Sequence, residues 1–103
     1  MTIVFLSVAT WYGDAHEGKT MANGQPFYKD DLTCATYLFD IGTELEVSYE
    51  GKSVFVVVTD RCDNKTDIDL SEAAFKAICP LEEGRIEVKV TYNYDDQLKL
   101  QEW

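Results

Sequence analysis

Apolar residues recur at every second position in several short segments, which is the spacing of a strand with one face in a core. Residues Glu44–Tyr49 alternate in this way, and so do residues Arg85–Tyr92, where the polar positions are mostly charged. Residues Ile3–Trp11 are rich in β-branched and apolar side chains, which favour strands. We therefore predict a strand over each of these three segments.

A fourth segment, Ser53–Thr59, contains the unbroken apolar run Val54–Val58. A continuous apolar run of this length is typical of a strand that is buried on both faces. Residues Glu50–Lys52 give only a tight connection to the preceding strand. We therefore predict a fully buried strand over residues Ser53–Thr59.

One short helix is predicted over Ser71–Ile78. Ser71 has the side chain of an N-cap residue, and the acidic residue after it suits the positive end of the helix dipole. Leu70 and Phe75 have the spacing of a hydrophobic staple across the helix start. Pro80 ends the helix, because proline cannot continue the hydrogen-bond ladder.

The elements together indicate one small, mostly-β barrel domain. A chain of 103 residues with 46% apolar residues supports a single modest core. Several strands and one helix fit within residues 1–94, and we interpret residues 95–103 as a polar C-terminal tail. Six glycines and one Asn-Gly turn signal fall mainly between the predicted strands.

The charge of the chain narrows the choice of partners and location. The net charge is -10, which argues against nucleic acid and anionic membrane surfaces as partners. Membrane insertion is not expected, since no apolar run approaches about twenty residues. Residues 1–9 lack a basic segment and are interpreted as the first strand, not as a signal peptide. We expect a protein that is either cytosolic or released by a route other than a leader of its own.

The cysteines and the single histidine argue against a metal site or another cofactor. Cys34, Cys62 and Cys79 show no zinc-ligand spacing, and His16 is the only histidine. We interpret the cysteines as free thiols in a reducing compartment, and a Cys34–Cys62 disulfide is the alternative. His16 lies in a glycine-flanked loop, where a surface position is more common than a catalytic one.

Candidate chemistry gathers at the ends of two predicted strands. Asp60 follows a buried strand, and Asp69 comes shortly before the predicted helix. Paired carboxylates suit a site that binds a sugar chain and transfers a proton to its glycosidic oxygen. The alternative for each carboxylate is a structural role in a loop or at the helix start. Trp11 and Tyr12 are adjacent in a strand and face opposite ways, and we expect Tyr12 to face the site.

Several motifs in order along the chain resemble those of the rare lipoprotein A-like (RlpA-like) double-psi β-barrel family, which is related to the catalytic domain of expansins. An aromatic pair with glycine stands first, at residues 11–13. The motifs that follow are Gly18–Gly24, Leu32–Ala35, Gly42-Thr43, Thr59–Arg61 and Ile68–Ser71. The resemblance covers about residues 9–92.

The resemblance implies a six-stranded double-psi β-barrel with one or two short helices. It also implies that Asp60 belongs to the active site, as in the cleaving members, and that Thr10, Asp60 and Asp69 line the groove, as in the expansin branch. We therefore assign Asp60 and Asp69 as catalytic residues, and Thr10 and Tyr12 to substrate binding. Family members that cleave glycan strands carry a Glu where this chain has Gln25, and a His where it has Thr36. These two residues cannot transfer protons usefully at neutral pH, so we assign them to substrate binding.

Three functions follow from the resemblance. The first is binding of peptidoglycan or a related wall polysaccharide, with lytic transglycosylase-like cleavage in which Asp60 is the acid/base. The second is an expansin-like module that binds and loosens a wall without breaking bonds. The third is a structural role in a virion or lysis complex, because a fold alone does not fix a function.

Overall fold

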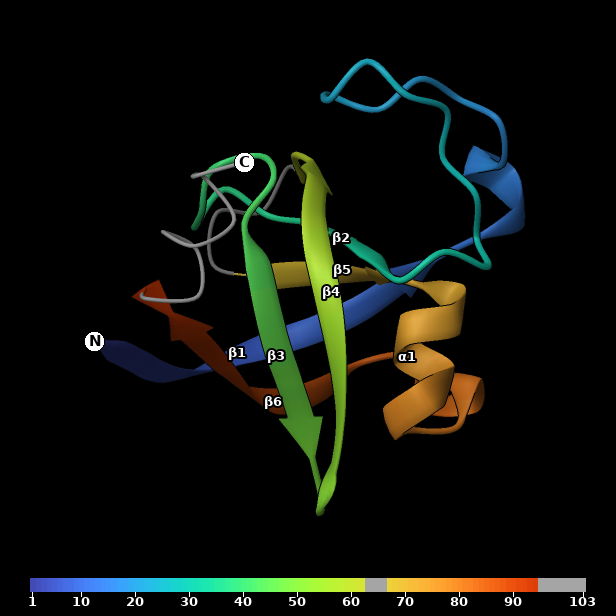
Figure 1. The fold of residues 1–103 in the computed structure, drawn as a ribbon. Helices are drawn as coiled ribbons and strands as arrows, with labels where there is room; N and C mark the ends of the chain where they lie inside the picture. Colours follow the sequence, from blue (N-terminus) through green and yellow to red (C-terminus); the bar gives the residue numbers. More distant parts are fainter. Residues whose placement is uncertain (63–66, 95–103) are drawn as a thin grey trace.

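Six strands form one closed barrel in a computed structural model of the chain, which describes residues 1–62 and 67–94. The prediction of a small, mostly-β barrel is confirmed (Figure 1). The strands are β1 Thr2–Tyr12, β2 Thr33–Ala35, β3 Glu44–Tyr49, β4 Lys52–Asp60, β5 Asp67–Ser71 and β6 Ile86–Asn93. The predicted tail, residues 95–103, lies outside the described residues.

The strand order places segments from different parts of the chain side by side. Around the barrel the order is β1-β5-β2-β4-β3-β6. Strand β1 is parallel to β5, and β2 is parallel to β4, while the other neighbours are antiparallel. Long loops follow β1, over residues 13–32, and β2, over residues 36–43. Figure 1 shows these loops at one end of the barrel, around the end of β4.

Alternate residues of the long strands point into the barrel and form its core. In β4, Val54, Val56 and Val58 point inward and are buried. The prediction of a fully buried strand is wrong, because Phe55 is 57% exposed and Val57 is 36% exposed. One face of β4 points into the barrel, and the other faces solvent. The apolar run therefore supplies the residues of both faces, although only one face is buried.

The predicted helix is confirmed as α1, Glu72–Ile78, and it packs beside β4 and β5. Ser71 is its N-cap, and the Ser71 Oγ accepts a hydrogen bond from the Ala74 N–H over 3.3 Å. Phe75 and Ile78 are buried against the end of the barrel. Two 3-10 turns, Asp14–His16 and Leu81–Glu83, complete the helical elements of the described residues.

Two strands have no clear pattern in the sequence. Strand β2 is only three residues long, and β5 joins directly to the N-cap of α1. All three cysteines are buried free thiols, so the alternative of a Cys34–Cys62 disulfide is not adopted. Within residues 1–62 and 67–94, no helix has the length and apolar character needed to cross a membrane.

Candidate functional site

The two predicted carboxylates lie on either side of one residue of the barrel wall. Ala35 in β2 pairs with Asp60 at the end of β4 and with Asp69 in β5. Neighbouring strands are about 4.8 Å apart, so the two aspartate Cα atoms are roughly 10 Å apart. Directly paired residues point to the same face of a sheet, which brings both carboxylates to one side of the wall.

Both carboxylates line a surface pocket with a volume of about 180 Å³. The lining residues are Tyr12, His16, Ala35, Asp60, Arg61, Cys62 and Asp69. Two larger hollows, of about 360 and 550 Å³, lie at the β3–β4 turn and beside α1. Neither of them is lined by a predicted site residue, so we treat the pocket around Ala35 as the candidate site.

Thr10 orients Asp69 from the adjacent strand. The two residues are paired in the parallel register of β1 and β5, and the Thr10 Oγ1 donates a hydrogen bond to the Asp69 Oδ1. A hydrogen bond to a charged group is stronger than one between neutral groups. Thr10 therefore belongs to the site by fixing a carboxylate, although it is not itself one of the lining residues.

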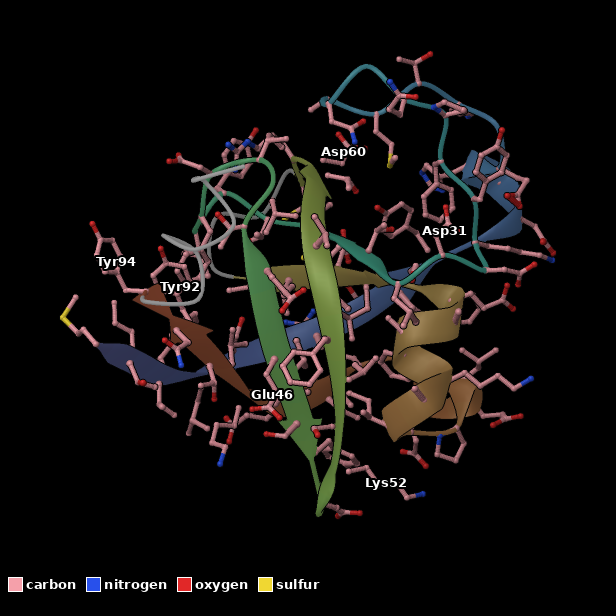
Figure 2. The ribbon with its side chains drawn as sticks, viewed as in Figure 1. Asp31, Glu46, Lys52, Asp60, Tyr92 and Tyr94 are labelled. Carbon is pink, nitrogen blue, oxygen red and sulfur yellow. The ribbon has the colours of Figure 1, made fainter. Side chains whose placement is uncertain are left out.

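Asp60 is held by main-chain donors through a single oxygen. Its Oδ1 accepts hydrogen bonds from the N–H groups of Ala22, over 3.0 Å, and Arg61, over 2.9 Å. Among the described residues no hydrogen bond or ion pair reaches its Oδ2. Figure 2 shows Asp60 at the end of β4, beneath the loop that precedes β2. One oxygen of Asp60 therefore fixes its orientation and the other is available to a ligand.

The loop above Asp60 is a short hairpin, residues 18–27, that we call the covering hairpin. Its two arms are joined by a bridge between Thr20 and Pro26 and by the Met21 N–H to Gln25 carbonyl bond of 2.8 Å. Gly24 has a φ of 86° in the turn, a conformation that favours glycine. The Asn23 N–H donates to the Thr59 carbonyl, which joins the turn to β4.

Arg61 fixes the segment on the other side of the pocket. Its Nη1 donates to the Thr36 carbonyl over 2.7 Å and to the Phe39 carbonyl over 2.5 Å. The main-chain carbonyl of Asp60 accepts a hydrogen bond from the Thr36 N–H. The adjacent residues Asp60 and Arg61 thus hold the two sides of the site, Asp60 through the covering hairpin and Arg61 through residues 36–39.

Tyr12 forms part of the pocket wall and is held there by two aromatic neighbours. Its ring stacks on Phe27 with a centroid distance of 4.5 Å, and His16 packs edge-on at 5.3 Å. Burial raises the pKa of the Tyr12 hydroxyl well above its usual value, and the charge of Asp60 adds to the shift. The Tyr12 Oη is buried and has no hydrogen-bond partner among the described residues.

Three of the six predicted site residues, Thr10, Gln25 and Thr36, do not line the pocket, and of these only Thr10 forms a hydrogen bond with a pocket carboxylate. Gln25 is exposed in the covering hairpin, and Thr36 is fully buried. The Thr36 Oγ1 accepts a hydrogen bond from the Leu38 N–H, so its hydroxyl stabilises the local turn. The structure brings Asp60, Asp69, Thr10 and Tyr12 together, and it does not bring these two residues to them.

Trp11 faces away from the site, as its alternation with Tyr12 requires. Its indole Nε1 donates to the Leu81 carbonyl over 3.0 Å, and its ring packs against the core. The side chains of residues 11 and 12 therefore point to opposite faces of β1.

The pocket contains four residues that the sequence did not single out as binding residues: His16, Ala35, Arg61 and Cys62. Arg61 and Cys62 directly follow Asp60, and Ala35 belongs to one of the motifs. The positions of these three residues in the sequence could therefore have indicated that they line the pocket. His16 is exposed, as its loop position predicted, but that position did not indicate that it also lines the pocket.

The site has no constellation for a metal ion in the part of the chain that the structure describes. No group of three or more His, Cys, Asp or Glu side chains is suitably placed there. Cys34 lies beneath the pocket, and burial raises the pKa of its thiol strongly. A buried thiol of this kind is a poor nucleophile, so the chemistry of the site depends on its carboxylates.

The sequence matches the family model described as lytic transglycolase, a double-psi β-barrel, over residues 6–90. It is 40% identical over 85 residues to an uncharacterised protein of Synechocystis, covering 81% of this chain and 92% of that protein. It is 36% identical over 89 residues to the endolytic peptidoglycan transglycosylase RlpA of Pseudomonas aeruginosa, covering 82% of this chain. The chain spans only 26% of the length of that enzyme.

Solved structures show the same fold. The Streptomyces papain inhibitor superposes with a TM-score of 0.75 at 27% identity, covering 88% of this chain and 96% of the inhibitor. An expansin of Clavibacter michiganensis superposes with a TM-score of 0.74 at 28% identity, covering 90% of this chain and 52% of the expansin. A mutant of that expansin has been solved in complex with cellohexaose.

Proposed function

The chain belongs to the RlpA-like double-psi β-barrel family, and from this membership we propose that its pocket binds a glycan strand of the peptidoglycan class and that Asp60 is the acid/base of lytic cleavage. The observation that carries the proposal is the pairing of both Asp60 and Asp69 with Ala35, which directs two carboxylates into one open pocket. Relatives named as peptidoglycan transglycosylases and an expansin solved with cellohexaose support a polysaccharide ligand.

The proposed reaction needs one proton-transfer group. Asp60 donates its proton to the glycosidic oxygen as the bond to C1 breaks. The same carboxylate then takes the proton of the sugar's own C6 hydroxyl as that oxygen attacks C1, which gives a 1,6-anhydro end without consuming water. Asp69, fixed by Thr10, stabilises the positive charge that develops on the sugar ring. Tyr12 remains protonated, and it forms part of the pocket wall beside both carboxylates.

A second candidate is a wall-binding module that breaks no bond. It is favoured by the positions of Gln25 and Thr36, which stand where cleaving members carry Glu and His and which lie outside the pocket. In this case Asp60, Asp69 and Thr10 would bind the glycan as they would in an expansin-like groove. A role in a virion or lysis complex stays a prediction from the sequence.

Purified glycan strands separate the two candidates. The protein is incubated with them, soluble products are analysed for 1,6-anhydro ends by mass spectrometry, and binding is measured by co-sedimentation. We expect anhydro products that Asp60→Asn reduces by a hundredfold to ten-thousandfold, the usual effect of losing a general acid. Asp31→Asn, which changes an exposed carboxylate away from the pocket, is the matched control.

Binding without anhydro products would establish the second candidate and exclude cleavage. Equal turnover by Asp60→Asn and the unaltered protein would show that Asp60 is not the acid. Failure to co-sediment with glycan strands would exclude both candidates.

A further inference from the structure

We propose that Asn23 is a site of covalent modification, at which the side-chain amide is converted to a carboxylate and the covering hairpin is loosened. The reaction uses the Gly24 main-chain nitrogen and water, so the proposal does not depend on the glycan-binding function. It is carried by the sequence Asn23-Gly24, by the exposure of both residues and by the hydrogen bonds that hold the turn.

The reaction has two steps. In the first, the Gly24 nitrogen loses its proton to solvent and attacks the Cγ atom of Asn23, which forms a cyclic imide. The side-chain nitrogen of Asn23 takes up a proton and leaves as ammonia. In the second step, water adds to one of the two imide carbonyl carbons and breaks the bond between that carbon and the Gly24 nitrogen. A water molecule is consumed and ammonia is released, and nothing is oxidised or reduced.

The second step has two possible products. Breakage of the bond at Cγ leaves an ordinary peptide bond and an aspartate at residue 23. Breakage at the main-chain carbonyl carbon leaves isoaspartate, in which the main chain runs through Cβ and Cγ of residue 23. Both products carry one negative charge that asparagine lacks, and isoaspartate also lengthens the main chain within the turn.

Gly24 leaves the attack sterically open. A glycine has no Cβ beside its nitrogen, so nothing on residue 24 blocks the approach to the Asn23 side chain. A Cβ built on Gly24 would meet no heavy atom within 4 Å outside the adjacent residues, so open space surrounds this part of the turn. Asn23 and Gly24 are both exposed. Water therefore reaches the atoms that react.

Two hydrogen bonds act on the reacting groups in the closed turn. The Gly24 N–H donates to the Met21 carbonyl over 2.9 Å, which holds the proton that the nitrogen must lose. The Asn23 Oδ1 accepts from the Gln25 N–H over 2.9 Å, which fixes the amide and polarises its carbonyl. The first bond opposes the attack and the second favours it. Because the attack begins with loss of the Gly24 proton, we expect the Met21 bond to dominate and the reaction to require an opened turn.

The turn is attached to β4 at two points beside the pocket. The Ala22 N–H donates to the Asp60 Oδ1 over 3.0 Å, and the Asn23 N–H donates to the Thr59 carbonyl over 3.1 Å. Loss of the Asp60 acceptor therefore raises the population of the opened turn and with it the reaction rate. Removing a hydrogen bond to a charged acceptor shifts such an equilibrium by about tenfold, which is about 1.4 kcal/mol.

The products weaken the same attachment. A carboxylate at residue 23 is next to the Ala22 N–H that binds Asp60, and like charges repel. In isoaspartate the lengthened main chain also changes the register between Met21 and Gln25, whose main-chain bond joins the two arms of the hairpin. We therefore expect the modified hairpin to be held less tightly over the pocket.

The test follows the protein during storage in a mildly alkaline buffer, which favours loss of the Gly24 proton. Digested samples are analysed by mass spectrometry for the conversion of Asn23, with aspartate and isoaspartate separated by chromatography. We expect slower conversion in the folded protein than in the chain unfolded by guanidinium chloride. Asp60→Ala should raise the folded-state rate about tenfold. Asp60→Asn retains an oxygen for the Ala22 N–H and should raise it less.

Ser71→Ala is the matched control for global unfolding. It removes the N-cap of α1 and leaves the bonds of the covering hairpin in place, so it should not change the rate of conversion. Amide hydrogen exchange in residues 20–26 measures the loosening of the hairpin after conversion. Asn23→Asp carries the new charge without the lengthened main chain, so its exchange should be faster than in the unaltered protein and slower than in the isoaspartate form.

The absence of conversion at Asn23 in both the folded and the unfolded chain would overturn the proposal. Equal rates in these two states would show that the turn does not restrain the amide. A rate that Ser71→Ala raises as much as Asp60→Ala does would overturn the coupling to Asp60, because the reaction would then follow global unfolding. Unchanged exchange in residues 20–26 after conversion would overturn the loosening. All of these outcomes leave the glycan-binding proposal as it stands.

Discussion

The Ala22 N–H donates to the Asp60 Oδ1 over 3.0 Å, and this bond joins two residues that are 38 positions apart in the sequence. It attaches the covering hairpin to the end of β4, directly above the pocket. Asp60 thus has a structural role that is separate from any proton transfer. The two roles use different atoms, since the main-chain donors bind Oδ1 and leave Oδ2 to a ligand.

Asp60→Ala and Asp60→Asn should therefore differ in stability. Asparagine keeps a side-chain oxygen for the Ala22 and Arg61 N–H groups, whereas alanine leaves both donors without that acceptor. We expect Asp60→Ala to lower the free energy of unfolding by about 1–3 kcal/mol more than Asp60→Asn does. Urea denaturation of the two variants measures this difference. Equal stabilities would mean that the Ala22 bond contributes nothing to the fold.

Thr10→Val tests the bond between Thr10 and Asp69. Valine keeps the shape of threonine and removes its hydroxyl, so Asp69 loses the donor that orients it. We expect weaker glycan binding and a loss of about 1–2 kcal/mol in the free energy of unfolding. Thr91→Val, on the half-buried outer face of β6, is the matched control and should change binding little.

A double-mutant cycle makes the Thr10 prediction specific. If the hydroxyl acts through Asp69, then the effects of Thr10→Val and Asp69→Asn on binding should not add, because each removes the same interaction. Strictly additive effects would show that Thr10 contributes to binding independently of Asp69.

Arg61→Lys should loosen the segment that Arg61 holds. Lysine replaces the planar guanidinium with an ammonium group on a shorter, flexible side chain, so it does not hold its donors at the position of Nη1 against the Thr36 and Phe39 carbonyls. We expect faster amide hydrogen exchange in residues 36–43, with the core of β4 unchanged. Arg85→Lys is the control, because Arg85 has a 62% exposed side chain and a single ion pair of 3.5 Å to Asp67. Unchanged exchange in residues 36–43 would contradict the role given to Arg61.

Two buried hydroxyls predict opposite effects on stability. Thr59 Oγ1 is buried without a hydrogen-bond partner among the described residues, so Thr59→Val should be neutral or stabilising. Ser71 Oγ donates to the Asp31 carbonyl over 2.5 Å and accepts from Ala74 at the start of α1. Ser71→Ala should therefore destabilise the protein by about 1–2 kcal/mol. Thermal melts of both variants give the comparison, and a clear loss in Thr59→Val would contradict it.

The sequence predicted the elements whose patterns are local. The alternating residues of β3 and β6 and the N-cap of α1 each sufficed for a correct prediction. Strand β2 was missed because three residues cannot show a period, and β5 was missed because its polar residues also suit a turn before a helix. The prediction that Phe55 and Val57 are buried was wrong, because an apolar run does not reveal whether the second face of its strand packs against another layer.

The candidate site depends on the register in which the strands pair, and no local pattern in the sequence indicates that register. Asp60 and Asp69 are brought together only because both pair with Ala35, and a shift of one residue in either pairing would turn a carboxylate to the other face. The motif resemblance pointed to Asp60 and Asp69, and the structure places both in the lining of one pocket. It could not show that Gln25 would be exposed in a hairpin or that Thr36 would be buried, since both positions depend on loop conformation.

Tyr12 makes the stability of the protein depend on pH in the alkaline range. Burial raises the pKa of its hydroxyl above the value of 10.0 that applies in the unfolded chain, and Asp60 adds to the shift. Its contribution to stability is therefore fully present below about pH 10. Above that pH the unfolded chain releases the phenol proton while the folded protein keeps it, so the free energy of unfolding falls. The expected slope is up to about 1.4 kcal/mol per pH unit.

Tyr12→Phe isolates this effect. Phenylalanine keeps the ring stacked on Phe27 and has no proton to lose, so the variant should show a shallower fall in stability above pH 10 than the unaltered protein. Tyr28→Phe is the matched control, because Tyr28 is 51% exposed and its loss should leave the slope as it was. Urea denaturation at a series of alkaline pH values gives the slopes. The same slope in Tyr12→Phe and the unaltered protein would mean that the Tyr12 hydroxyl titrates alike in both states, and that the pocket does not bury it.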